Sequence, residues 1–205
     1  AACGKRVFLP TADARLIALD AASGKVCPGF GENGVVDLSA NMPYYYAGSY
    51  YSTSPPVIAG GLIIIGGAVN DNVSTTEPSG VIRAYRADTG ALVWNFDTGN
   101  PEQTEPIQAG DTYTPNSPNA WSILSVDPDL GMVYAPIGNA PPDQWGGQRT
   151  DETERFSSSV IALDLETGAL RWVFQTVHHD LWDMDVPSQP TLVDIRYPSG
   201  VRQAL

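Results

Sequence analysis

Short apolar stretches recur along the chain and are separated by turn-forming residues. Residues 7–9, 62–65 and 132–135 are almost wholly apolar, and residues 56–59, 121–126 and 189–193 form further stretches of the same kind. Short runs rich in Val, Ile and aromatic residues, bounded by Gly, Pro and Asn, predict β-strands. We therefore expect an all-β fold in which helices are limited to short turns.

One sequence pattern occurs three times. In each copy a Gly follows an Ala by six residues, and in the second and third copies a Trp follows the Ala by ten; the copies are Ala18/Gly24, Ala84/Gly90/Trp94 and Ala162/Gly168/Trp172. The Gly supplies the positive φ of a tight turn, so each copy predicts a β-hairpin. In the later copies the second strand of the hairpin carries the Trp.

Further predicted strands precede the hairpins and give four short strands per repeat. Repeats of four antiparallel strands build the blades of a β-propeller. The Ala would let adjacent blades approach, and the Trp would cover the face between them. The expected units are residues 1–51 (partial), 52–119, 120–187 and 188–205 (partial), so the chain is predicted to be an arc of a larger ring. A β-sandwich with accidental similarity between its strands is the alternative.

Charge narrows the range of partners. The 205-residue chain has 11 Lys and Arg against 23 Asp and Glu, and its net charge is −12. Such a chain repels a phosphate backbone and an anionic membrane surface, so we expect no nucleic-acid partner. No apolar stretch approaches the roughly 20 residues of a membrane span. Any membrane anchor is expected to lie outside this chain.

The chain contains two cysteines, Cys3 and Cys27. They could be buried thiols, or they could form one disulfide, which would fit an oxidising compartment. Cys3 precedes the first predicted strand, and Cys27 ends the last strand expected in the same unit. Because antiparallel neighbours can bring such ends within about 5.5 Å between Cα atoms, we predict that the two are joined.

Side chains that could carry chemistry gather in residues 177–185, directly after a predicted strand. This segment holds three carboxylates, an indole and both histidines of the chain. Adjacent histidines do not easily bind one metal ion and no Cys lies near them, so a zinc site is disfavoured.

Three other predicted loops lie at the ends of successive blades, which a propeller brings together near its axis. Residues 66–72 and 136–139 carry Asp and Asn after glycines, and residues 116–121 end in a Trp. Oxygen donors beside a Trp indicate a calcium site next to a flat ligand. The alternatives are ordinary turns for the first two segments and a core position for the Trp.

Taken together, these segments resemble the quinoprotein dehydrogenases. The motifs are the Asp-x-x-Thr-Gly-x-x-x-Trp repeat, His-His-Asp-Leu-Trp-Asp-Met-Asp, Thr-Ser-Pro-Pro, Asn-Ser-Pro-Asn-x-Trp and Pro-Asp-Gln-Trp-Gly-Gly. The likeness is strongest to the membrane-bound branch that acts on glucose, quinate, shikimate and polyols. It implies an eight-bladed propeller that binds pyrroloquinoline quinone (PQQ) and Ca²⁺ on its axis, at the periplasmic face of the bacterial inner membrane. It also implies a membrane segment, outside this chain, that passes electrons to ubiquinone.

The resemblance assigns roles to individual residues. Asp183 corresponds to the catalytic base that also contacts the calcium, and Trp121 to the aromatic side chain that stacks on the quinone. Thr53 corresponds to a contact of a quinone carboxylate. The further calcium ligands implied are Asp71, Asn72 and, by the pattern of the alcohol-oxidising relatives, Asn139. The basic partner of the quinone carbonyl belongs to a later blade.

The implied activity is oxidation of a sugar or polyol hydroxyl of the glucose type, by hydride transfer to PQQ. The alternatives are a quinate or shikimate dehydrogenase acting on a cyclic hydroxy acid, a soluble alcohol dehydrogenase of the same cofactor class, and a non-catalytic propeller scaffold. The cluster at residues 177–185 favours an enzyme, because a scaffold has no need of it. This stretch of chain is expected to be inactive by itself.

Overall fold

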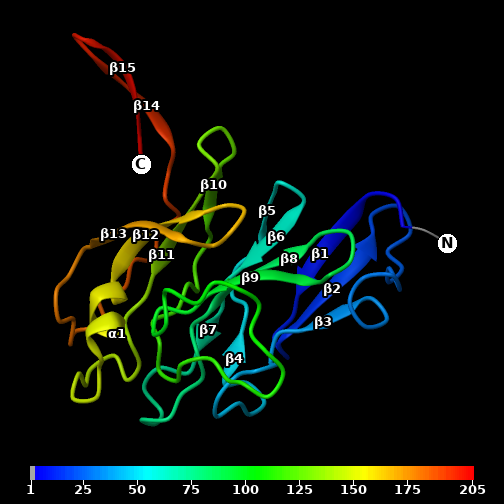
Figure 1. The fold of residues 1–205 in the computed structure, drawn as a ribbon, viewed down its shortest axis with the longest axis horizontal. Coiled ribbons are helices and arrows are strands. Elements are labelled where there is room, and N and C mark those ends of the chain that lie inside the picture. The colour runs from blue at the N-terminus through cyan, green and yellow to red at the C-terminus, as the bar shows by residue number, and fades with distance from the viewer. Residues whose placement is uncertain (1–2) are drawn as a thin grey trace.

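The computed structural model describes residues 3–205. Within them, short strands form five small antiparallel sheets, and the one helix, α1 (Asp151–Phe156), has six residues (Figure 1). The prediction of an all-β fold with only short helical turns is confirmed. No helix among the described residues is long and apolar enough to cross a membrane.

Two sheets have four strands each and repeat one another. The first has the order β5 (Val57–Ala59), β6 (Leu62–Ile65), β8 (Ile82–Arg86) and β9 (Leu92–Phe96). The second has the order β10 (Ser125–Asp127), β11 (Met132–Ile137), β12 (Ser159–Asp164) and β13 (Leu170–Gln175). In both, sequential strands are neighbours and antiparallel, which is the arrangement of a propeller blade.

The repeated residues form the contact between these two sheets. Ala84 and Trp94 belong to the apolar core between these sheets, where Ala84 is fully buried and Trp94 is 1% exposed; Ala162 is also fully buried but lies outside that core, paired with Trp172. The Trp94 indole donates a hydrogen bond to the Leu165 carbonyl (3.0 Å) and lies against Gly168, which has a φ of +71°. One apolar core lies between these sheets and another between the first four-stranded sheet and the N-terminal sheet. The N-terminal sheet and the two four-stranded sheets therefore pack face to face in succession, as the repeat predicts.

The N-terminal sheet departs from the prediction. It consists of β1 (Arg6–Pro10), β2 (Arg15–Asp20) and β3 (Val35–Asp37), and a small β4 (Tyr50–Tyr51) and β7 (Ala68–Val69) pair lies nearby in the chain. The strand expected after Gly24 is reduced to a single bridge between Leu19 and Val26. Pro28 has no N–H to extend that pairing, so β3 takes its place beside β2.

Two other expected strands are wrong in extent. Of residues 121–126 only the end joins β10; Ser122 and Leu124 instead hydrogen-bond to residues 187 and 189. The strand expected at 189–193 contains Pro190, which cannot donate to a ladder. The last pair is β14 (Val193–Tyr197) and β15 (Gly200–Ala204), a hairpin that projects from the rest (Figure 1).

The predicted disulfide is confirmed. Cys3 and Cys27 are bonded, with 5.7 Å between their Cα atoms. The bond ties the segment before β1 to the loop that follows β2, in the region where regular pairing has ended.

Candidate active site

Antiparallel topology brings four connections to one end of the two blades. The chain alternates direction from strand to strand, so the β6–β8 and β11–β12 connections leave from the same end as the segments after β9 and β13. These connections contain five of the six predicted site residues, Asp71, Asn72, Trp121, Asn139 and Asp183, and the sixth, Thr53, lies in the segment that leads into β5. The tight glycine turns at 90 and 168 lie at the opposite end.

The Trp121 ring is held in place by a carboxylate. Its indole Nε1 donates to Asp185 Oδ2 at 2.7 Å, and the backbone N–H of Asn139 donates to the other oxygen of Asp185 at 2.5 Å. Gly138 lets these groups approach, because a Cβ there would lie 3.1 Å from both Trp121 Nε1 and Asp185 Oδ1. Asp185 thus fixes the orientation of the one aromatic side chain predicted to face a flat ligand.

Asn139 joins two of the loops. Its side chain is buried, and Nδ2 donates to the carbonyls of Asp143 (2.8 Å) and Asp180 (3.1 Å). Its Oδ1 accepts the N–H of Ala140 at 3.0 Å. The amide nitrogen is committed to structure, so Oδ1 is the atom of Asn139 that remains for a cation.

Asp180 shapes the loop that carries Asp183. Asp180 is fully buried and accepts hydrogen bonds from the Ser158 hydroxyl (2.5 Å) and from the backbone N–H groups of Trp182 (2.9 Å) and Met184 (2.8 Å). Burial alone would raise the pKa of Asp180, but these donors lower it. Asp183 itself has a φ of 60° and is exposed, so its carboxylate is presented on the surface of a loop that Asp180 holds.

Several carboxylates of these loops repel one another. Burial, together with the charges of Asp71 and Asp183, raises the pKa of Asp143 to about 8. Asp183 is exposed but partly desolvated by the surrounding loops, and this, with the charges of Asp185 and Asp71, raises its pKa; burial also raises the pKa of Asp185. Carboxylates whose ionised forms destabilise one another attract a cation.

The remaining predicted residues lie beside these groups. The Thr53 hydroxyl and the Ser54 hydroxyl both donate to the Trp121 carbonyl. Asn72 Nδ2 donates to Asp143 Oδ2 at 3.1 Å. Hydrogen bonds therefore place Thr53 beside the Trp121 backbone and Asn72 beside Asp143. Asp71 also belongs to this group, because its charge contributes to the raised pKa of Asp143.

The donor chemistry of the site suits calcium. Carboxylate and amide oxygens are the ligands that Ca²⁺ prefers, and the oriented indole offers a flat wall next to them. Among residues 3–205, no three acidic, His or Cys side chains stand close enough to hold one ion as they are placed. A bound cation would have to draw these side chains together.

Two site residues, Asp143 and Asp185, were not assigned a site role from the sequence. Asp143 is 2% exposed and lies within the Pro-Asp-Gln-Trp-Gly-Gly motif, so the motif itself marked its position. Asp185 belongs to the cluster at residues 177–185 but has no assigned role there; in the structure it holds the Trp121 indole. No local signal predicts that pairing, because the partners are 64 residues apart.

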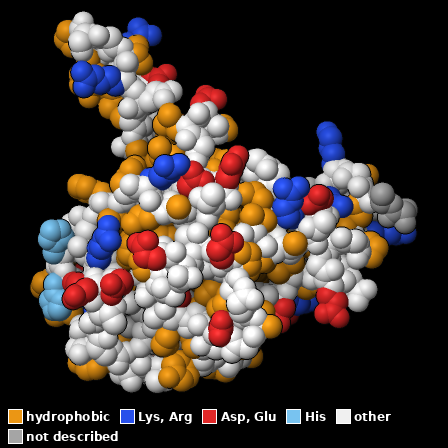
Figure 2. All heavy atoms as spheres, viewed as in Figure 1, with side chains coloured by type: hydrophobic (Ala, Val, Ile, Leu, Met, Phe, Trp, Pro, Cys, Tyr) orange, Lys and Arg blue, Asp and Glu red, His pale blue; other side chains and the backbone are white. Residues whose placement is uncertain are grey.

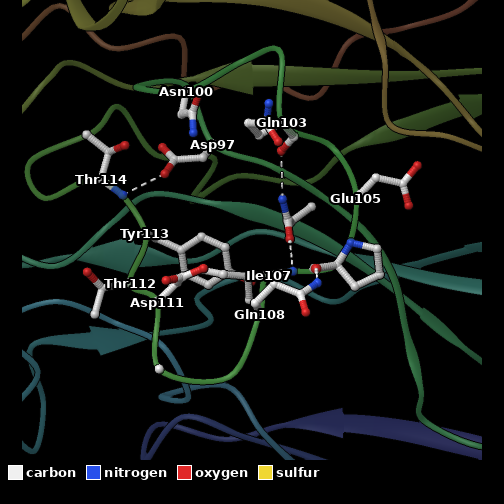
Figure 3. Close-up of a pocket in the computed structure, with 13 residues that line it drawn as sticks. Asp97, Asn100, Gln103, Glu105, Ile107, Gln108, Asp111, Thr112, Tyr113 and Thr114 are labelled. Atoms are coloured by element: carbon white, nitrogen blue, oxygen red, sulfur yellow. Dashed lines mark hydrogen bonds between the residues drawn. The ribbon is translucent and has the colours of Figure 1, made fainter.

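A separate hollow of about 530 Å³ lies in the connection after β9 (Figure 3). The buried Asp97 and Tyr113 line it together with the exposed Gln103 and Glu105. Asp97 accepts the backbone N–H of Thr114 at 2.6 Å. None of the predicted site residues lines this hollow. It is therefore distinct from the acidic site, by which we mean the loops that carry Asp71, Asp143, Asp183 and Asp185.

The family follows from a direct comparison. A model of the PQQ-type β-propeller domain of glucose, ethanol and alcohol dehydrogenases matches residues 1–205. The chain belongs to this family. The resemblance inferred from the motifs and the propeller fold are both confirmed.

Similar proteins lie within the same group of enzymes. Quinoprotein glucose dehydrogenase A of Acinetobacter calcoaceticus is 50% identical over 97% of this chain and 25% of its own length. Quinate/shikimate dehydrogenase (quinone) of Acinetobacter baylyi is 43% identical over 97% of this chain and 25% of its length. The solved quinohemoprotein alcohol dehydrogenase ADHIIG of Pseudomonas putida HK5 has a TM-score of 0.73 at 25% identity, over 97% of this chain and 29% of that one. The chain spans about a quarter of the length of the curated relatives it matches.

Proposed function

We propose that the protein containing this chain is a PQQ-dependent dehydrogenase that oxidises a sugar or polyol hydroxyl of the glucose type. The observation that carries the proposal is the exposed Asp183 carboxylate, two residues from Asp185, which orients the Trp121 indole. The 50% identity to a quinoprotein glucose dehydrogenase, against 43% to a quinate/shikimate enzyme, supports glucose-type substrates over cyclic acids.

Different residues of this chain would bind the calcium ion and the quinone. Calcium would be held by oxygens of Asp71, Asn72, Asn139 and Asp183, and its charge would offset the repulsion that raises the pKa of Asp183. The Trp121 ring would bear on the quinone plane, and the neighbouring Thr53 would contact a quinone carboxylate. When bound, PQQ supplies the hydride acceptor, and Ca²⁺ supplies the positive charge that favours reduction.

Asp183 would move the proton in this reaction. An alcohol that gives up hydride must also lose its hydroxyl proton, and an exposed, ionised carboxylate can accept it. The buried Asp180 is unsuited to that role, because its oxygens are occupied by the Ser158, Trp182 and Met184 donors. Its contribution is the shape of the loop.

The partners follow from the same proposal. Electrons would pass from the quinone site to ubiquinone through a membrane segment of the full-length protein. The site would face the periplasm of a bacterial inner membrane, and the Cys3–Cys27 disulfide is consistent with that oxidising compartment.

Turnover of the full-length Asp183→Asn variant tests the proposal. Asn keeps the shape and an oxygen for the cation but cannot accept a proton, so kcat on D-glucose should fall by about 10²-fold or more. Asp180→Asn is the control, and it should lose stability or cofactor affinity before kcat. Near-parental kcat in Asp183→Asn would place the base elsewhere, and oxidation of quinate but not D-glucose by the parent would select the quinate branch.

A further inference from the structure

Arg149 is a buried cation in the β11–β12 connection. Its side chain is 3% exposed, and Nη2 donates to the carbonyls of Ala140 (3.2 Å) and Asp143 (3.1 Å). Its Nε and Nη1 find no hydrogen-bond partner in the described part of the chain. Burying a guanidinium with unpaired donors is unfavourable. Packing alone therefore does not account for an Arg at this position.

The nearest carboxylate to Arg149 is shared with a second loop. Glu154 of α1 places Oε2 3.5 Å from Arg149 Nη1 and Oε1 3.2 Å from Nδ1 of His179. A Thr150–Thr153 capping box holds the start of α1, and Gln175 Nε2 donates to the Glu154 carbonyl at 2.7 Å. These contacts fix the position of Glu154 between Arg149 of the β11–β12 connection and His179 of the segment after β13. Figure 2 shows the histidine side chains beside acidic ones at one edge of the molecule.

Both ends of this chain of contacts lead to the acidic site. At one end, the Asp143 carbonyl that accepts from Arg149 also accepts from Asn139. At the other end, His179 has a φ of 47° and directly precedes Asp180, which shapes the loop of Asp183. The two loops also touch, because a Cβ on Gly146 would lie 3.0 Å from His179 Cε1.

We propose that Arg149, Glu154 and His179 form a bridge that fixes the loop of Asp183 to the loop of Asn139 and Asp143. Arg149 is then a positioning residue: it touches no reacting group, and it acts through two backbone carbonyls and Glu154. The bridge sets the separation between carboxylates on different loops, which a cation site requires. Its consequence for turnover rests on the proposed function, whereas its effect on loop order does not.

Hydrogen exchange in the full-length protein without added cofactor tests the bridge. Glu154→Ala removes both side-chain contacts of Glu154 from a half-buried position, and Arg149→Gln removes the cation. In each variant, amides of residues 177–187 should exchange roughly tenfold faster or more, as expected for losing a charge-assisted contact. Glu152→Ala is the matched control, because Glu152 is an exposed acid of the same helical turn. It should leave that peptide unchanged.

The result that overturns the proposal is parental exchange of residues 177–187 in Glu154→Ala. If Arg149→Gln fails to fold, Glu154→Ala still decides the question. Faster exchange confined to residues 140–156 would also overturn it, because Arg149 would then support only its own loop.

A second measurement separates positioning from stability. In the enzyme reconstituted with PQQ and Ca²⁺, Glu154→Ala should lower kcat several-fold with little change in KM, and Glu152→Ala should match the parent. Parental kcat in Glu154→Ala would contradict the bridge. A parent that shows no PQQ-dependent turnover would instead refute the proposed function, and the exchange result would still decide the bridge.

Discussion

Gly168→Ala tests the packing between blades at a single methyl group. Gly168 ends the repeated turn of the second four-stranded sheet, with a φ of +71°, and the Trp94 ring of the preceding sheet lies on it. A Cβ at this position would lie 2.6 Å from Trp94 Cε3, closer than any normal contact. The Trp94 side chain is 1% exposed and hydrogen-bonded to Leu165, so it has little room to move.

Two separate costs add at Gly168. A non-glycine residue in the left-handed region costs about 1–2 kcal/mol. Forcing a methyl group into a packed aromatic contact costs about 1–3 kcal/mol more. We therefore expect Gly168→Ala to lower the free energy of unfolding by about 2–5 kcal/mol.

Gly24→Ala is the matched control, because Gly24 occupies the equivalent turn at a φ of +69° and, chain neighbours aside, no atom of residues 3–205 lies within 4 Å of its Cβ position. It should cost only the backbone term of about 1–2 kcal/mol. Urea unfolding measures both, as a shift of the midpoint at constant slope. Equal losses for the two variants would refute the Trp94 contact, and so would a Gly168→Ala loss that persists undiminished in a Trp94→Ala background.

Three further predictions concern other contacts. Thiol titration of the denatured chain without reductant should find no free thiol, and reducing the Cys3–Cys27 bond should cost about 3 kcal/mol on the chain-entropy model; two titratable thiols would contradict the bond. Trp94→Phe should cost about 1–2 kcal/mol in thermal unfolding, because the buried Leu165 carbonyl loses its donor; an unchanged Tm would argue against that hydrogen bond. Trp121→Ala in the full-length enzyme should weaken PQQ binding in a fluorescence titration, since the flat wall is lost; parental affinity would remove its stacking role.

The parts of the fold that were predictable are those specified by local pattern. β6 is a continuous apolar run buried on both faces, and the glycine turn at 168 requires a positive φ, so both were visible in the sequence. The errors fall where the backbone lacks a donor or finds a distant partner. Pro190 interrupts one expected strand, Pro28 prevents pairing beyond Cys27, and β3, which begins seven residues after Pro28, lies beside β2 instead.

As with the fold, only part of the candidate site could be predicted from the sequence. The motifs placed Trp121, Asn139 and Asp183 in loops that the antiparallel topology brings to one end of the blades. What holds them there is set by contacts between loops, such as the pairing of Trp121 with Asp185. Such pairs depend on how successive blades pack, and no periodicity in the sequence encodes them.

The most direct test is a crystal structure of the full-length protein with PQQ and Ca²⁺ bound. We expect a cation coordinated by Asp183 and Asp71 and a quinone plane lying against the Trp121 ring, with Asp185 still accepting a hydrogen bond from the indole. A cation or quinone bound away from the loops that carry Asp71, Asn139 and Asp183 would contradict it.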